Sequence, residues 1–249
     1  MRIILLLFCT FLIAKCSNNI ETQKKKIDGY IVESSFKEDS IFDGITNTFN
    51  LDGKLISSFY YSNGYKNGFG KTFYSNGRIY DSSNYTNGLI NGSYFMYDSF
   101  GNLIYKNYHF YGQKMGDELF FKERDISEFV FLSFEKKILF NCAYDSLGIK
   151  GASGNILNIN SYAVNLGKQK KQGIFVYLIY PPKVFVKYSL GIFNKETNEK
   201  KEILNIRSER RFFDTTMPLL EEKYKYYVSA FYADTLNNFK RIYISTIEN

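Results

Sequence analysis

The feature that most constrains this chain is a 24-residue repeat between about Asp28 and Phe121. Three series of glycines keep the spacing: Gly44, Gly68, Gly92 and Gly116; Gly53, Gly77 and Gly101; Gly64, Gly88 and Gly112. Two apolar series keep it as well: Phe49, Phe73, Tyr97 and Phe121; Leu55, Ile79 and Leu103. A period of this length indicates an array of similar supersecondary units.

Each unit carries two turn signals. The first is Asp52-Gly53, Asn76-Gly77 or Phe100-Gly101, and Asn-Gly between apolar residues predicts a β-hairpin. Phe73 and Ile79 each belong to a series that recurs every 24 residues, so we expect both side chains on the same face of the sheet. That arrangement favours a three-residue loop at 75–77 closed by a glycine bulge. The second signal is longer and runs from Asn63 to Gly68. Glycine tolerates the positive φ that such positions need.

The composition favours strands. The chain of 249 residues has 22 Tyr, 24 Phe, 3 Pro and no Trp, and Tyr and Phe suit a pleated, half-buried surface. The predicted fold is all-β: an elongated antiparallel β-meander of 24-residue hairpins, followed by a β-sandwich. On the sheet we expect exposed tyrosines to form a binding surface, and the candidates are Tyr60, Tyr74, Tyr80 and Tyr108.

Residues 74–79 (YSNGRI) and 85–92 (YTNGLING) resemble the MORN-repeat variant of bacterial proteins. The resemblance covers Asp28 to about Phe121. It implies hairpins in an elongated sheet that contacts protein or lipid, with no chemistry of its own. Many proteins with such repeats are described as antitoxins of toxin–antitoxin pairs, a cytoplasmic role that the N-terminus of this chain argues against.

From Arg124 the glycine period is lost, and short β-branched and aromatic runs predict a β-sandwich over residues 124–249. Residues 148–154 and 167–173 are interpreted as long loops. Around residues 220–230 the sequence resembles the tyrosine corner and following strand of fibronectin type III-like domains, carried by Leu220, Tyr226, Val228 and Ala230. That resemblance implies a spacer or binding module.

The N-terminus predicts export. Residues 1–15 have the charge and apolar run of a signal peptide, and residues 12–16 (LIAKC) resemble a lipobox in which Cys16 would carry lipid, with Lys15 departing from the pattern. Residues 16–27 are interpreted as a tether, before the repeat array at 28–123. The three lysines at 24–26 are interpreted as part of a solvated linker, with an anionic membrane surface as the alternative. The predicted location is the cell envelope, on an outer membrane facing the periplasm.

The sequence argues against an enzyme: we expect no catalytic residue, metal site or cofactor. His109 is the only histidine and occupies the repeat position of Tyr61 and Tyr85, so we interpret it as an aromatic repeat residue. Three carboxylates, Asp125, Glu128 and Glu135, fit a solvated face better than a glycosidase pair. The net charge of +7 falls to about +5 without residues 1–15, and for an exported chain we expect no nucleic-acid partner.

Four short motifs resemble acceptors of periplasmic O-glycosylation, centred on Ser40, Ser146, Thr215 and Thr235. Our leading hypothesis is a non-catalytic envelope lipoprotein that binds an envelope protein or surface as a scaffold. The alternatives are a glycan-binding protein or an accessory to a glycan-acting enzyme, and a partner of a secreted toxin.

Overall fold

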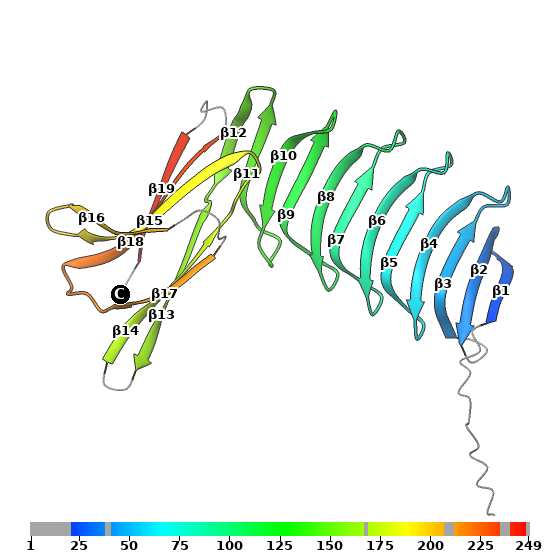
Figure 1. Ribbon diagram of the computed structural model, residues 1–249, viewed down its shortest axis with the longest axis horizontal. Coiled ribbons are helices and arrows are strands. Elements are labelled where there is room, and N and C mark those ends of the chain that lie inside the picture. The colour runs from blue at the N-terminus through cyan, green and yellow to red at the C-terminus, as the bar shows by residue number, and fades with distance from the viewer. Residues whose placement is uncertain (1–20, 38–40, 167–168, 207–211, 235–239, 248–249) are drawn as a thin grey trace, which may run out of the picture.

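The computed structural model describes residues 21–37, 41–166, 169–206, 212–234 and 240–247, and the regular structure in these ranges is all β-strand. The first twelve strands form one antiparallel sheet in sequence order, confirming the predicted meander (Figure 1). They are β1 (Glu21–Ile27), β2 (Tyr30–Lys37), β3 (Ile41–Phe49), β4 (Leu55–Ser62), β5 (Tyr65–Phe73), β6 (Ile79–Thr86), β7 (Leu89–Tyr97), β8 (Leu103–Phe110), β9 (Gln113–Lys122), β10 (Asp125–Leu132), β11 (Ile138–Asp145) and β12 (Gly148–Gly154).

Three-residue turns join β3 to β4, β5 to β6 and β7 to β8. In the middle one, Tyr74 N donates to Arg78 O over 2.8 Å and Gly77 N donates to Tyr74 O over 2.9 Å. Phe73 then pairs directly with Ile79, as its 24-residue phase predicted. Gly77 has φ +82°, the left-handed conformation that closes a type I turn with a glycine bulge.

At the other edge of the sheet, two-residue turns join β4 to β5, β6 to β7 and β8 to β9. Asn63 and Gly64 have φ of +50° and +82°, as a type I′ turn requires. The longer turn predicted for residues 63–68 is therefore wrong: Gly68 lies inside β5, with φ +101°, at a β-bulge in the β4–β5 pairing. One glycine series thus lies at β-bulges inside the strands, where these glycines adopt the positive φ that a residue without Cβ tolerates.

Both predicted limits of the repeat array differ from those of the sheet. Residues 21–27, predicted as tether, form β1 and pair with β2 along their whole length. At the other end the sheet continues through β12, so residues 124–154 belong to it, and residues 148–154 form a strand where we expected a loop. Lys136, with φ +62°, replaces the turn glycine between β10 and β11, which explains why the glycine period fades while the hairpins continue.

The two sheets of the following β-sandwich contain β13 (Leu157–Leu166), β14 (Gln169–Leu178), β15 (Val184–Asn194), β16 (Lys200–Ile206), β17 (Phe212–Pro218), β18 (Tyr224–Asp234) and β19 (Lys240–Ile247). One sheet has the order β13-β14-β17, and the other β16-β15-β18-β19. Residues 169–173 lie in β14, not in the predicted loop, and Gly173 fits there because Tyr162 of β13 lies across it.

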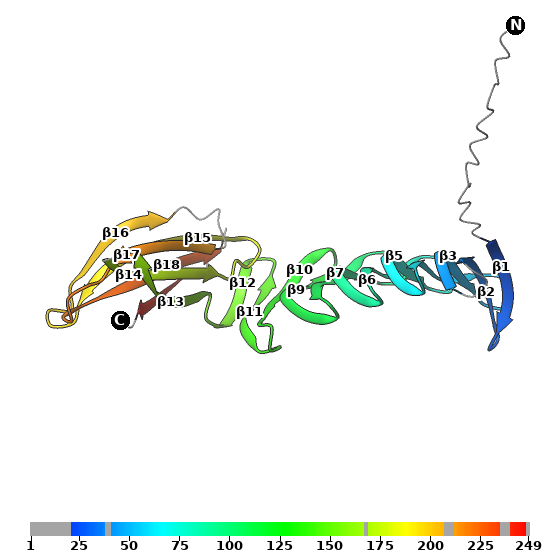
Figure 2. The same ribbon diagram turned by 90° about the horizontal axis from the view of Figure 1, so that it is seen from below.

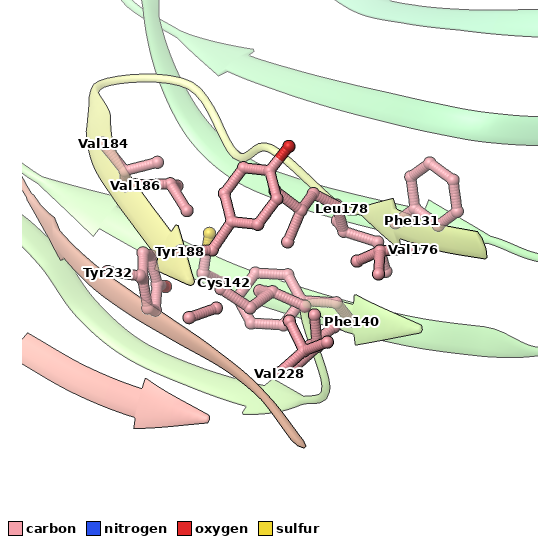
Figure 3. Packing of buried hydrophobic residues seen from close by; sticks show 14 of the residues in the cluster. Phe131, Phe140, Cys142, Val176, Leu178, Val184, Val186, Tyr188, Val228 and Tyr232 are labelled. Carbon is pink, nitrogen blue, oxygen red and sulfur yellow. The ribbon is translucent and has the colours of Figure 1, made fainter. Parts of the chain in front are cut away.

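The hydrophobic core lies in the sandwich and extends into the last strands of the long sheet. Val176, Tyr188 and Val228 are at most 1% exposed and come from both sandwich sheets, while Phe140 and Cys142 come from β11 (Figure 3). The ring centroids of Phe140 and Tyr232 of β18 lie 6.0 Å apart. The long sheet and the sandwich therefore share one core.

Polar contacts reinforce this junction. The Tyr144 hydroxyl donates to Pro182 O over 2.7 Å, and Ile149 N donates to the buried carboxylate of Asp234 over 3.1 Å. Figure 2 shows the molecule side-on, with the sandwich at the β12 end of the long sheet and β1 at the opposite end.

Candidate functional site

One face of the long sheet carries a continuous row of cross-strand neighbours, which we call the ladder face. Direct pairing links, in order, Ser34, Thr46, Phe59, Gly70, Ser83, Tyr94 and Asn107. Directly paired residues point to the same side of a sheet. The row runs from β2 to β8, so the ladder face extends over most of the sheet.

A polar cluster occupies the β8–β9 end of the ladder face and comprises Tyr105, Asn107, His109, Lys114 and Glu118. The Tyr105 hydroxyl donates to the Glu118 carboxylate, and Lys114 Nζ lies 2.8 Å from Glu118 Oε1. Asn107 Nδ2 donates to Tyr105 Oη over 3.0 Å and contacts His109 Nε2 at 3.3 Å. Asn107 and Glu118 are only 3% and 5% exposed, so the cluster is partly shielded from water.

Burial dominates the electrostatics of the cluster. Desolvation raises the pKa of Tyr105 above its usual range, and its hydrogen bond to Glu118 adds to the shift. Desolvation lowers the pKa of His109, which favours the neutral ring. A neutral ring with its proton on Nδ1 faces Gly112 O at 3.5 Å and accepts at Nε2 from Asn107.

Every ionisable group of the cluster therefore contacts either another side chain of the cluster or a neighbouring backbone carbonyl. Lys114 and Glu118 neutralise each other, and the Tyr105 hydroxyl donates a hydrogen bond to the same carboxylate. Such an arrangement fits a hydrogen-bond network that holds β8 and β9 together. His109 pairs with Gly92 as Tyr61 pairs with Gly44 and Tyr85 with Gly68, so it occupies the aromatic repeat position to which the spacing assigned it.

The β4–β7 part of the ladder face is aromatic instead. The rings of Phe59 and Tyr85 meet edge to face with centroids 5.6 Å apart. Lys66 Nζ lies 3.5 Å from the centroid of Phe59, and desolvation lowers the pKa of this lysine. This cation–π arrangement stabilises the packing of β4, β5 and β6.

The four tyrosines proposed as a binding surface do not form one site. Tyr74 and Tyr80 contact each other, with ring centroids 5.1 Å apart, beside the three-residue turn, and Tyr74 donates to Tyr97 O over 2.8 Å. Tyr60 and Tyr108 lie opposite the ladder face, on β4 and β8, and are about 45% exposed. Four strand spacings of about 4.8 Å separate those two strands, so Tyr60 and Tyr108 are about 19 Å apart along the sheet.

All ten glycines singled out from the repeat adopt positive φ, between +74° and +120°. They fall into three structural roles. Gly53, Gly77 and Gly101 close three-residue turns, while Gly64, Gly88 and Gly112 complete two-residue turns. The remaining four lie inside strands: Gly44, Gly68, Gly92 and Gly116.

An exposed apolar row, which sequence reasoning missed, lies beside the two-residue turns. We call it the turn stripe, and it comprises Ile41, Tyr65, Leu89 and Tyr111, which are 40%, 60%, 48% and 52% exposed. The first three are 24 residues apart. Each of these three lies against the glycine of the next turn: a Cβ at Gly64 would be 3.7 Å from Ile41 Cγ2, one at Gly88 would be 3.7 Å from Tyr65 Cδ1, and one at Gly112 would be 3.4 Å from Leu89 Cδ2.

Backbone hydrogen bonds fix the turn stripe. Gly64 N donates to Phe42 O, Gly88 N to Lys66 O and Gly112 N to Ile90 O, over 2.8, 2.8 and 2.7 Å. Each bond joins a turn to the preceding hairpin. The stripe is therefore held on stacked turns at one spacing per two strands, about 10 Å.

A cleft of about 740 Å³ opens at the sandwich end remote from the long sheet, beside the β15–β16 hairpin and the β17–β18 loop. Ile192, Leu220 and Tyr224 line its apolar part, and Lys200 and Glu221 lie at its rim. Its volume suits a small ligand. No buried polar group fixes an orientation among the described residues that line it.

The structure describes some of the predicted modification sites and carboxylates, while others lie outside the described residues. Ser146 is exposed in the β11–β12 turn, and Thr215 is half-buried in β17, paired with Ile174. Cys16, Ser40 and Thr235, together with the predicted signal peptide, lie outside the described residues. Asp125 pairs with Lys183 at 3.3 Å, and Glu135 pairs with Lys137 at 2.8 Å.

Comparisons with known proteins give no family: no protein-family model matches the chain, and no curated protein matches it. Within the described ranges, no three His, Cys, Asp or Glu side chains are grouped so that they could hold a metal ion. The same ranges contain no helix that is long and apolar enough to cross a membrane.

Proposed function

We propose that this protein is a non-catalytic cell-envelope lipoprotein that binds an envelope protein through the repeat part of its long sheet. The observation that carries the proposal is the turn stripe. Tyr65 and Leu89 expose large apolar surface at a fixed spacing on hydrogen-bonded turns. Exposed apolar surface on a rigid framework is typical of protein interaction sites.

The proposal also assigns each of the two parts of the chain to a known type of β-structure. The repeat region is a MORN-like array, supported by the alternating turns and the sequential strand order. The sandwich is fibronectin type III-like, supported by its three-plus-four strand order and by Tyr226, whose hydroxyl donates to Pro218 O over 2.8 Å as in a tyrosine corner. Both relationships favour binding over catalysis.

Lipidation at Cys16 would hold the protein at the membrane, on the periplasmic side of the outer membrane. Metabolic labelling with a fatty acid tests this step. We expect label on the native chain and none on Cys16→Ser. Equal labelling of both proteins would contradict the anchor.

The partner is sought by photocrosslinking in intact cell envelopes. A benzophenone amino acid replaces Tyr65 or Leu89 in two variants, and Glu196 at the exposed tip of the β15–β16 hairpin in a control. We expect the same crosslinked protein from positions 65 and 89 and not from position 196. Crosslinks from position 196 alone would reject the turn stripe as the binding surface.

A second candidate is glycan binding, favoured by Tyr60, Phe69 and Tyr108, which are 44–48% exposed on the sheet face opposite the ladder face. Exposed rings of this kind can stack on sugars. Co-sedimentation with purified peptidoglycan tests it. Loss of co-sedimentation in Tyr60→Ala/Tyr108→Ala, with retention in Tyr65→Ala/Leu89→Ala, would favour this candidate over the protein partner.

A further inference from the structure

β1, the first strand of the long sheet, carries three consecutive lysines. β1 pairs with β2 on one side, and no described strand pairs with it on the other. Lys24, Lys25 and Lys26 follow one another along it, all exposed. No described residue forms an ion pair with any of the three, although Lys24 and Lys25 lie over the rings of Phe49 and Phe36 at 5.6 and 5.4 Å.

The lysines stand beside exposed apolar groups. Ile27 and Tyr30 pair across the tip of the β1–β2 hairpin and are 46% and 47% exposed. Two acidic residues lie nearby: Glu33 is paired with Lys24 and points to the same sheet face, and Asp28 lies in the turn. Lysines next to an apolar–aromatic tip are the combination that suits the headgroup layer of an anionic bilayer.

The distance to the proposed anchor agrees with such a contact. Glu21 begins β1, and only four residues separate it from Cys16. Five residue steps span at most about 18 Å when fully extended. If Cys16 is lipidated, as proposed above, the start of β1 at Glu21 has to lie within that distance of the bilayer.

A second copy of the chain fits this edge poorly. Antiparallel pairing of two β1 strands would place the lysines of one copy opposite those of the other, and like charges directly opposite destabilise a sheet. The lysines also protect the edge from pairing with other strands. Lipid phosphates satisfy the same charges without strand pairing.

We propose that β1 and the tip of the β1–β2 hairpin lie against an anionic lipid surface. The long sheet then leads away from the membrane, and the sandwich is held at its far end. Eleven strand spacings separate β1 from β12, so the sandwich begins about 50 Å along the sheet from the lipid.

Vesicle binding tests the contact without the anchor. The probe is the mature chain (residues 16–249) with Cys16→Ser, which contains every described strand, and vesicles of phosphatidylcholine with or without phosphatidylglycerol. We expect binding only to the anionic vesicles, falling about a hundredfold in Lys24→Gln/Lys25→Gln/Lys26→Gln. The control Lys200→Gln/Lys201→Gln, which removes two charges from the sandwich, should change the binding less than twofold. Equal losses in both variants, or equal binding to neutral vesicles, would overturn the proposal.

A reporter for orientation gives a second readout, because the chain has no tryptophan. Thr22→Trp places an indole on exposed β1, and Glu222→Trp places one at the remote end of the sandwich. We expect brominated lipids to quench the first and not the second. Quenching of the second alone would reverse the orientation, whereas absence of fatty-acid label on Cys16 would reject only the anchor.

Discussion

The ring of Phe59 lies across Gly70, its direct partner on the neighbouring strand of the ladder face. A ring over a glycine covers backbone that would otherwise be open to water, and it leaves no room for a larger residue. The same arrangement occurs twice in the sandwich, in the pairs Tyr162 with Gly173 and Tyr227 with Gly191. Three of the strand glycines thus serve packing rather than turn formation.

Gly70→Ala should destabilise the long sheet. The new methyl group would overlap the ring of Phe59, and overpacking of this kind costs about 1–3 kcal/mol of unfolding free energy. Urea unfolding followed by circular dichroism measures the change.

The matched control is Gly151→Ala on β12, where a Cβ meets no atom within 4 Å. This change should alter the unfolding free energy by less than about 0.5 kcal/mol. In Phe59→Ala/Gly70→Ala the overlap is absent, so the loss should be smaller than the sum of the single changes. Equal losses in Gly70→Ala and Gly151→Ala would refute the packing role.

Tyr226→Phe should destabilise the sandwich by about 1–2 kcal/mol, because Pro218 O loses its 2.8 Å hydrogen bond at a buried tyrosine. Tyr224→Phe, two residues earlier on the same strand, removes the hydroxyl of a tyrosine that is only partly buried and should have little effect. Thermal unfolding of both variants tests the difference. An unchanged midpoint for Tyr226→Phe would mean that the bond adds nothing.

Cys142 should resist alkylation in the folded protein. Burial raises the pKa of its thiol to about 12, and each pKa unit reduces the reactive thiolate about tenfold. Iodoacetamide at pH 8 should therefore label Cys142 of the Cys16→Ser protein only after addition of urea. Mass spectrometry follows the label, and rapid labelling without denaturant would contradict the buried position.

The stability of the long sheet should fall as the pH falls from about 7.5 to 5.5. Burial lowers the pKa of His109 below its value of about 6.5 in the unfolded chain, so the unfolded chain binds the extra proton first. His109→Tyr restores the residue found at positions 61 and 85 and should flatten the dependence. The urea midpoint against pH measures it, and identical slopes for both proteins would disprove the role of His109.

The sequence predicted the meander because its determinants are local. A 24-residue spacing that recurs in both glycines and apolar residues defines hairpins paired with their neighbours. The pairing of Phe73 with Ile79 followed from the requirement that both side chains lie on one face of the sheet. The bulges inside the strands could not be predicted, because Asn67-Gly68 inside a strand looks the same in sequence as Asn63-Gly64 in a turn. Only the β4–β5 pairing distinguishes them.

The limits of the sheet and the polar cluster depend on contacts that a single sequence does not display. Lys136 adopts a glycine conformation without being glycine, so the β10–β11 hairpin gave no signal. Glu118 occupies the repeat position held by Gly70 and Tyr94, and its burial becomes evident only beside Tyr105 and Lys114. The turn stripe was missed because exposed Tyr65 and Leu89 carry no motif.

The backbone bonds from the glycines of the two-residue turns to the preceding hairpin, such as Gly64 N to Phe42 O, join each repeat unit to its neighbours in the sequence. Removal or duplication of one 24-residue unit would preserve the phase of every remaining strand. Evolution can therefore change the reach of this molecule in steps of about 10 Å while both ends stay as they are.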